Sequence, residues 1–393
     1  MKFTRRSSLA AVPAALLAAR APKSFPIRKD YLREREDIPA FWISSVAEVN
    51  AFLRQRVAKG RVASIGTTAG GRAMNAVFYG QPRQGKGTTT FSGSLGFGDV
   101  KAWIGPDHER KVYFAMAAVH GGEFEGIVGA VNLIAVLETG KDLRGRAWPE
   151  ITAVAEKLDR IVILPVTNVD GRSRVPMRMT PWQGSDHTVS EYFNTGGKLD
   201  GNIIGWPQCK QNIPVDFSKV QFPGGYPNDA GVNCQHDDFF GNKQPETAAL
   251  LALAARERPD VTMNMHTGAV FMHPLRSFIE PALMPRFDEI YVRIITGLTK
   301  AGLQRSDDPA VTADPSRERM SGFNLDSAFN MHCGSLSVLV ESPSHAFSTA
   351  KRNGQPFTHS PDNLLDAQLI CHQEAMRYLA DTAGRARWTA KKA

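Results

Sequence analysis

Hydrophobic residues recur along the chain at two different spacings between about residue 40 and residue 383. Helical spacing predicts helices over 46–56, 123–138, 244–256, 285–303 and 362–383. Short apolar runs predict strands over 61–65, 73–79, 111–119, 160–166, 260–265 and 335–340. An alternation of helices and strands is typical of an α/β layer fold, in which helices pack on a central sheet.

Two stretches of the chain lack this periodicity. Residues 80–106 are rich in Gly, Thr, Ser and Pro, which predicts a long hairpin or a surface excursion. Residues 171–241 hold many Gly, Pro, Asn and Asp residues. Loops of that length in a compact domain are usually functional, so we expect a functional role for 171–241.

The N-terminus has the layout of an export signal. Arg5 and Arg6 precede an apolar run from Leu9 to Ala19. That run is too short for a bilayer, which needs about 20 residues. The arginine pair is similar to a twin-arginine signal, although general secretory signals are also basic. We expect residues 1–21 to be a cleaved signal, a protein that is periplasmic or secreted, and no membrane span elsewhere.

The net charge of +8 is concentrated at the two ends of the chain. The 393 residues include 47 Lys and Arg and 39 Asp and Glu. Eight basic residues and no acid lie in 1–21 and 385–393, so the rest of the chain carries 39 charges of each sign. A formally neutral body offers no basic surface for a phosphate backbone, and we expect no nucleic-acid partner.

Chain length and composition predict one large domain. With 42% hydrophobic residues, the chain can build a sizeable core without disulfides. We assign a lead-in to 22–39, the domain to 40–383 and a basic tail to 384–393. The four cysteines are Cys209, Cys234, Cys333 and Cys371. Export permits disulfides, but four cysteines allow three complete pairings, and buried free thiols remain equally open.

Residues that can bind a metal follow several of the predicted strands. His120 and Glu123 lie in a His-Gly-Gly-Glu turn after one strand, His266 ends a second and Glu341 ends a third. Imidazole and carboxylate are ligands that zinc accepts, and we expect the two glycines to let the backbone pass close to a metal. Ligands of open α/β sheets bind beyond the carboxyl ends of the strands, so these side chains should converge on one cleft. The Asn-Val-Asp-Gly segment at 168–171 follows another strand and should join the same rim.

This order of His-x-x-Glu, His and Glu resembles the zinc carboxypeptidase family, the carboxypeptidase A-like metallopeptidases. Three local sequences are also similar to it: Gly71-Arg72 to an early Gly-Arg turn, 165–171 to Pro-x-x-Asn-Pro-Asp-Gly, and Gly241 with 245–247 to the segment before the third ligand. The resemblance runs from about residue 40 to residue 383. It implies an α/β fold with a mixed, mainly parallel central sheet flanked by helices on both faces.

The resemblance also implies a site and an activity. One zinc ion per chain would be held by His120, Glu123 and His266, with an open position for water and Glu341 as general base. Three protein ligands plus water are the arrangement of catalytic zinc, and a nearby carboxylate can take a proton and return it. The implied function is a zinc-dependent metallopeptidase that hydrolyses amide bonds of a peptide or a cell-wall peptide.

The chain departs from the family where the substrate is held. The family clamps the C-terminal carboxylate of its substrate with an Asn-Arg pair, and Gln235 and His236 stand in those places. We expect both to bind substrate, but an imidazole is a poorer carboxylate partner than an arginine fork, so a preference for free C-termini is not implied. The family's Asp that orients a zinc-bound histidine becomes Asn233, whose oxygen can still accept that hydrogen bond.

A second departure concerns the residue that stabilises the oxyanion. The family's Trp-Arg-Lys stretch is replaced by 206–210, which leaves Lys210 as the candidate for this catalytic task and Arg174 and Arg178 as alternatives. Two other functions stay open. A deacylase of the same fold would release an acyl group from an amino acid, and a non-catalytic exported protein would keep only the cleft. The complete set of ligands and base argues against the second of these.

Overall fold

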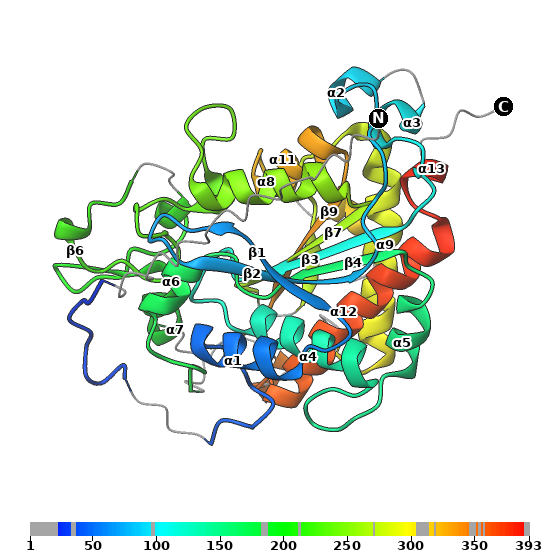
Figure 1. The fold of residues 1–393 in the computed structure, drawn as a ribbon. Coiled ribbons are helices and arrows are strands. Elements are labelled where there is room, and N and C mark those ends of the chain that lie inside the picture. The colour runs from blue at the N-terminus through cyan, green and yellow to red at the C-terminus, as the bar shows by residue number, and fades with distance from the viewer. Residues whose placement is uncertain are drawn as a thin grey trace, which may run out of the picture.

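The computed structural model describes residues 23–32, 37–95, 99–181, 188–210, 214–269, 272–303, 314–317, 320–345 and 358–388, with the backbone of 351–352 and 355–356 (Figure 1). The expected export signal at 1–21 lies outside these residues. No helix within the described ranges is long and apolar enough to cross a membrane.

A seven-stranded sheet forms the centre of the described chain. Its strands are β1 (Arg61–Thr67), β2 (Ala73–Gly80), β3 (Val112–Ala117), β4 (Arg160–Leu164), β7 (Val261–Thr267), β8 (His273–Leu275) and β9 (Leu336–Ser342), in the order β1-β2-β4-β3-β7-β9-β8. The central strands β4, β3, β7 and β9 run parallel. The edge strands β1 and β8 pair antiparallel with β2 and β9, and β2 pairs antiparallel with β4. The mixed sheet confirms the predicted fold class.

Strands β3, β4 and β7 are buried along their whole length, and β3 and β4 read as nearly continuous apolar runs. Every residue of β3, β4 and β7 is buried. Parallel strands of this kind are covered on both faces by helices and need no polar alternation. The edge strand β1, by contrast, exposes several of its residues.

Helices cover both faces of the sheet (Figure 1). One layer contains α1 (Val46–Arg56), α4 (Glu125–Thr139), α5 (Pro149–Ala155), α9 (Met284–Lys300) and α12 (Pro361–Thr382). The opposite layer contains α8 (Pro245–Glu257) and α11 (Leu325–Cys333). The helix predicted at 46–56 has those bounds, and a capping box between Ser45 and Glu48 fixes its start. The structure therefore confirms the predicted helices and their layers.

The segment over 80–106 corrects one prediction. It holds two short helices, α2 (Phe91–Ser94) and α3 (Val100–Ile104), and is no hairpin. Strand β4 lies between β2 and β3 in the sheet, so the segment must cross over a strand before β3 begins. The alternative prediction, a surface excursion, agrees with its exposed residues.

The remaining described elements are short. They are α6 (Val169–Arg174), α7 (Thr188–Thr195), α13 (Arg385–Trp388), four minor strands and five turns of 3₁₀ helix. The minor strands are β5 (Gly197–Lys198), β6 (Val220–Phe222), β10 (Lys351–Arg352) and β11 (Gln355–Pro356). The 3₁₀ turns are η1 (Gln208–Lys210), η2 (Phe217–Lys219), η3 (Cys234–His236), η4 (Pro281–Leu283) and η5 (Pro315–Arg317). Most of the expected functional loop, from α6 to α8, lies at the left of the sheet in Figure 1.

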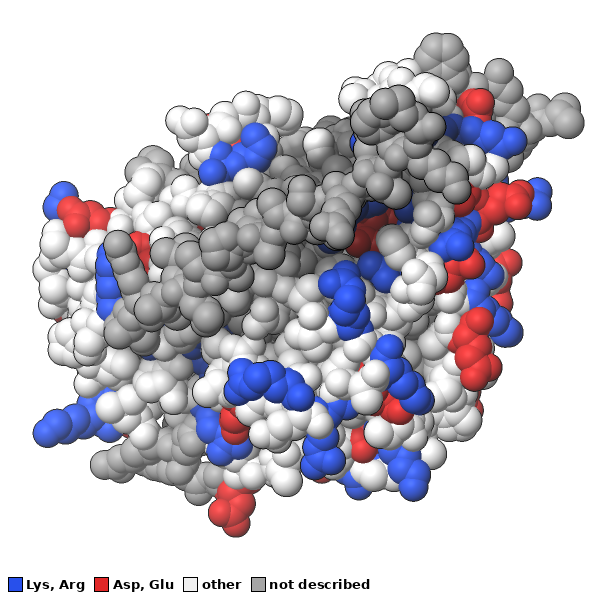
Figure 2. All heavy atoms as spheres, viewed as in Figure 1, with Lys and Arg blue, Asp and Glu red and all other residues white. Residues whose placement is uncertain are grey.

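Charged side chains are scattered over the described surface. Figure 2 shows Lys and Arg with Asp and Glu among them on one face, without a continuous basic patch. Arg385, assigned to the basic tail, is buried, and its backbone N–H donates to the Asp260 carboxylate at 2.8 Å. All four cysteines are free thiols, and three of them are buried.

Candidate metal centre and its cavity

The ends of three parallel strands bring the predicted ligands and base together. Strand β3 ends at Ala117, and Ala118 turns the chain with a φ of 53° before His120. His266 lies in β7 and Glu341 in β9, and the two residues are direct neighbours in the strand register. Because β3, β7 and β9 are parallel, their carboxyl ends lie at one edge of the sheet.

The two glycines between His120 and Glu123 allow the turn to contact other backbone. A Cβ at Gly121 would lie 2.1 Å from the Arg172 nitrogen, and one at Gly122 would lie 2.6 Å from the Cα of Asn194. The Gly121 N–H donates to the carbonyl of Gly225 at 2.7 Å. These glycines therefore make room for the loops around the site, and the expected close approach of this backbone to a metal stays a prediction.

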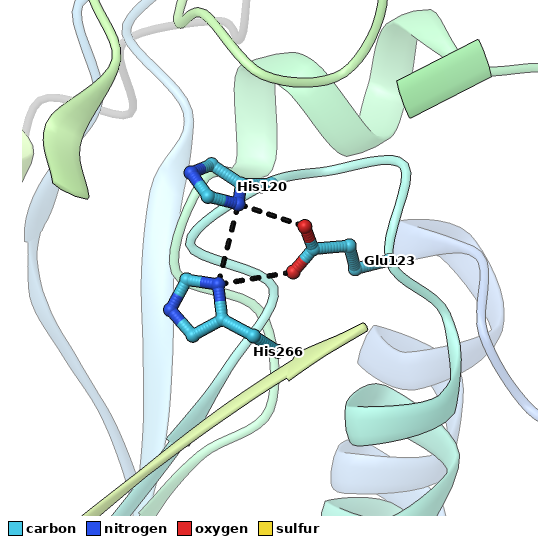
Figure 3. Close-up of side chains that lie close together, drawn as sticks. All are labelled: His120, Glu123 and His266. Carbon is cyan, nitrogen blue, oxygen red and sulfur yellow. Dashed lines mark hydrogen bonds and ion pairs between the residues drawn. The ribbon is translucent and has the colours of Figure 1, made fainter. Parts of the chain in front are cut away.

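His120, Glu123 and His266 form a tight, buried group. The Nδ1 of His120 lies 2.8 Å from Oε1 of Glu123, and the Nδ1 of His266 lies 3.1 Å from Oε2 of the same carboxylate. The two Nδ1 atoms are 3.2 Å apart. Figure 3 shows the Glu123 carboxylate directed between the two imidazoles. These are the three residues of the described chain whose ligand atoms gather as a metal-binding group.

The geometry of this group fits a zinc ion. Zinc–nitrogen and zinc–oxygen bonds of about 2.0–2.1 Å in a tetrahedron place neighbouring ligand atoms about 3.3 Å apart, close to the observed spacings. The Nε2–H of His120 donates to Oδ1 of Asn233 at 3.1 Å, which leaves Nδ1 unprotonated in a neutral ring. An unprotonated Nδ1 facing a carboxylate oxygen at 2.8 Å needs a shared cation or proton between them.

The electrostatics of the group also favour a cation. Burial alone would raise the pKa of Glu123, but the two imidazoles lower it to about 2. Burial alone would lower the pKa of His266, but Glu123 raises it to about 9. Burial lowers the pKa of His120 despite the same carboxylate. One buried negative charge thus attracts positive charge to the point where both imidazoles meet, and a bound metal would displace a proton there.

Three residues of the predicted functional loop contact the ligands from outside. Asn194 donates from Nδ2 to Oε1 of Glu123 at 3.2 Å. The ring of Tyr226 stacks on the imidazole of His120, with centroids 3.6 Å apart and an angle of 6° between the planes. Asn233 accepts from His120, as the resemblance implies. No sequence pattern pointed to Asn194 or Tyr226 beyond their position in a long loop.

Glu341 lies beside this group in a different environment. Burial raises the pKa of its carboxyl to about 7, with Glu123 and Asp326 adding to the effect and His266 opposing it. Among the described residues no hydrogen-bond partner reaches Oε2 of Glu341. Such a carboxyl can exchange a proton near neutral pH, as a general base requires.

A cavity of about 410 Å³ opens in front of the ligands and Glu341. Its described lining combines the two histidine ligands and Glu341 with the predicted substrate-side residues Lys210, Gln235 and His236. Apolar and small polar side chains complete the wall: Trp206, Tyr226, Leu275, Met320, Ser321, Gly322, Asn324 and Leu339. All seven site residues predicted from the sequence therefore lie in or around one cavity.

The three substrate-side residues differ in what they can offer. Lys210 lies in η1 with its Nζ 5.5 Å from the Trp206 ring centroid. Burial, with the charge of Lys210 adding to it, lowers the pKa of His236 to about 3, so this imidazole is neutral. Gln235 is buried, and its Nε2 donates to Asp326 at 2.9 Å while its Oε1 accepts from Asn264 at 3.2 Å.

The two arginines considered for the oxyanion lie elsewhere. Arg174 is buried and donates to the carbonyl groups of Gly224, Pro227 and Asn228 and to the Asp229 carboxylate. The Nε of Arg178 forms an ion pair with Glu48 at 2.8 Å. Neither arginine lines the cavity, and within the described lining Lys210 is the only Lys or Arg.

Solved structures, one of them a metallo-carboxypeptidase, share this fold. A metallo-carboxypeptidase from Burkholderia cenocepacia superimposes with a TM-score of 0.52 at 15% identity, covering 85% of this chain and 69% of its own. Thrombin activatable fibrinolysis inhibitor superimposes with a TM-score of 0.50 at 11% identity, covering 91% and 85%. No curated protein sequence gives a significant match.

The family model described as zinc carboxypeptidase matches residues 50–293, more than half of the chain. The match includes the three ligand residues, whereas Glu341 lies beyond it and reaches the site through strand β9. Family, fold and ligand geometry agree, and the chain belongs to the zinc carboxypeptidase family.

Proposed function

We propose that this protein is a zinc-dependent metallopeptidase that hydrolyses peptide amide bonds. The observation that carries the proposal is the spacing of His120, Glu123 and His266, which fits one zinc ion. Beside them in the same cavity lies a Glu341 oxygen that has no hydrogen-bond partner among the described residues. Zinc held by these ligands would polarise the substrate carbonyl and make a water molecule acidic enough to attack it.

Glu341 is the proton carrier in this proposal. Its carboxylate takes the proton of the attacking water and returns it to the leaving amine. The raised pKa supports both halves of this task, because a carboxyl that titrates near 7 can accept and release a proton at neutral pH.

Lys210 is the proposed donor to the carbonyl oxygen as negative charge develops there. It is the one Lys or Arg in the described lining of the cavity, and an ammonium group is a strong donor to an oxyanion. Its Nζ packs over an exposed Trp206 ring, which supports a side chain held at the cavity mouth and not buried in an ion pair.

Gln235 and His236 are the proposed substrate-binding residues, and they favour substrates without a free carboxylate at this position. The Gln235 amide is bound to the Asp326 carboxylate, and the imidazole of His236 is neutral. A neutral amide and a neutral imidazole with a buried negative charge behind them hold a carboxylate poorly. Amidated ends or internal peptide bonds, including those of cell-wall peptides, fit this lining better.

We further propose that the protein is exported to the periplasm or secreted. The support is the sequence of residues 1–21, with its arginine pair and short apolar run. Mass analysis of the mature protein from an expressing cell should show loss of this segment. Replacement of both Arg5 and Arg6 by Lys should retain the precursor if the signal is of the twin-arginine type.

The test of the activity is mass spectrometry of defined peptides and cell-wall fragments after incubation with the zinc-loaded protein. A metallopeptidase releases peptide fragments, and chelation of the metal stops the release. Release of acyl groups from N-acyl amino acids would show a deacylase instead. Binding of fragments without any new product would show a binding protein.

A further inference from the structure

Part of the loop over 171–241, for which the sequence pattern predicts no regular element, packs directly against the metal ligand His120. The Gly225 carbonyl accepts from the Gly121 N–H, and a Cβ at Gly225 would lie 2.2 Å from the Gly122 nitrogen. The loop and the His-Gly-Gly-Glu turn are thus in backbone contact. This contact delivers the next residue, Tyr226, to the face of the His120 ring.

The backbone of Tyr226 is fixed on both sides. Its N–H donates to the Asn194 carbonyl at 2.9 Å, and its own carbonyl accepts from Nδ2 of Asn168 at 3.0 Å. Just downstream, the Asp229 carboxylate forms ion pairs with Arg72 and Arg174 at 2.8 and 2.9 Å. The backbone position of Tyr226 is therefore set by the fold.

His120 has an electrically neutral hydrogen-bond partner. Its Nε2–H donates to the Asn233 amide oxygen at 3.1 Å, and that oxygen also accepts from the Gln235 N–H at 3.0 Å. Hydrogen bonds to neutral acceptors are weaker than those to carboxylates, so this one restrains the imidazole less firmly. The stacked Tyr226 ring adds the missing restraint, because parallel contact at 3.6 Å prevents the imidazole from tilting.

We propose that Tyr226 is a positioning residue that holds the His120 imidazole in its metal-binding orientation. The aromatic ring carries the effect, and the hydroxyl group is not required for it. A metal on Nδ1 makes the imidazole more positive, and the negative face of the phenol ring then stabilises the metal-bound form further. This inference rests on the zinc binding in the proposed function and does not require peptidase activity.

The experiment measures zinc affinity by competition with a chelator of known affinity. Y226F keeps the ring and should bind zinc within about 2-fold of the wild type. Y226A and the bulkier Y226L remove the ring and should bind about 10-fold more weakly, the lower end of what lost outer partners of metal ligands cost. L199A, a change at an exposed apolar residue of the same loop, should leave the affinity unchanged. Thermal unfolding of each variant identifies those that fold.

A coupled substitution separates positioning from general damage to the loop. N233D gives His120 a charged acceptor, so in the Y226L background it should restore most of the lost zinc affinity. The visible absorption of the cobalt-substituted protein should change in Y226L and be the same in Y226F and the wild type. Equal zinc affinities for Y226F and Y226L, or no recovery by N233D, would overturn the proposal. Because zinc binding is the readout, an absence of peptidase activity would count against the proposed function alone.

Discussion

Replacement of Glu341 by Gln separates the proposed chemistry from metal binding more clearly than any other change. Gln keeps the shape of the side chain but cannot take a proton from water. Loss of a general base typically costs 10² to 10⁴ in rate, or about 3–5 kcal/mol of transition-state stabilisation. Glu341 is not one of the three residues whose ligand atoms gather as the metal-binding group, so we expect E341Q to keep about one zinc ion per chain.

The pH dependence gives this prediction a second, independent signature. With a pKa of about 7, the Glu341 carboxyl is about one-tenth ionised at pH 6 and about nine-tenths at pH 8. A bound divalent cation lowers the pKa of a nearby carboxyl, so kcat/KM of the zinc-loaded wild type should rise with an apparent pKa at or below about 7. Residual E341Q activity should lack this acidic limb.

The stability of the metal-free protein should fall over the pH range in which activity rises. The Glu341 carboxyl has a pKa near 4.5 when unfolded and about 7 when folded, so the metal-free wild type loses stability as pH rises from 4.5 to 7. The loss is at most about 3 kcal/mol at 1.36 kcal/mol per pKa unit, and water in the cavity reduces it. Metal-free E341Q should therefore gain more stability over wild type at pH 8 than at pH 5, measured by urea unfolding.

Turnover, zinc content and urea midpoints of the two proteins at both pH values form the complete assay. Turnover of E341Q within 3-fold of the wild type, with an unchanged acidic limb, would refute the assignment of Glu341 as the base. Loss of zinc together with loss of activity would instead make Glu341 part of the metal site.

Three further predictions use the same protein. H120A should lower the zinc content of the protein. H372Q should not, because His372 is buried outside the site and hydrogen-bonded to Tyr113. Unchanged zinc content in H120A would show that His120 is not a ligand. Wild type should cleave amidated peptides at least as well as peptides with a free C-terminal acid. H236R should shift the ratio of the two cleavage rates toward free acids by about 10-fold, because a guanidinium binds a carboxylate bidentately. A strong preference of the wild type for free acids would contradict the proposed lining. D170N should destabilise the protein by about 3 kcal/mol in urea unfolding, because it weakens a buried ion pair with Arg72. D200N changes an exposed aspartate and should unfold like the wild type.

The position of Asp170 shows what the motif at 168–171 does. Its carboxylate accepts from Arg72 at 2.6 Å and from the Gly70 N–H at 2.8 Å, and Asn168 caps the short helix α6. The Asn-Val-Asp-Gly segment thus ties the turn between β1 and β2 to the loop that carries Tyr226. The segment does not line the cavity, and it contributes to the site by holding this loop in place.

The sequence by itself determined the layers and the positions of the ligands along the chain. Runs of apolar residues record burial, and β3 and β4 are buried at every position. Polar residues directly after such runs lie at the carboxyl ends of parallel strands. That is why the sequence alone assigns His120, His266 and Glu341 to one cleft.

Only the tertiary structure decided what surrounds those ligands. The stacking of Tyr226 on His120, the hydrogen bond from Asn194 to Glu123 and the burial of Gln235 against Asp326 join residues that lie 71 to 106 positions apart in the chain. The same holds for Arg174, which packs among the carbonyl groups of its own loop. Local spacing reports whether a side chain is buried, but it carries no information about which distant group it meets, because that depends on how loops of irregular backbone pack against one another.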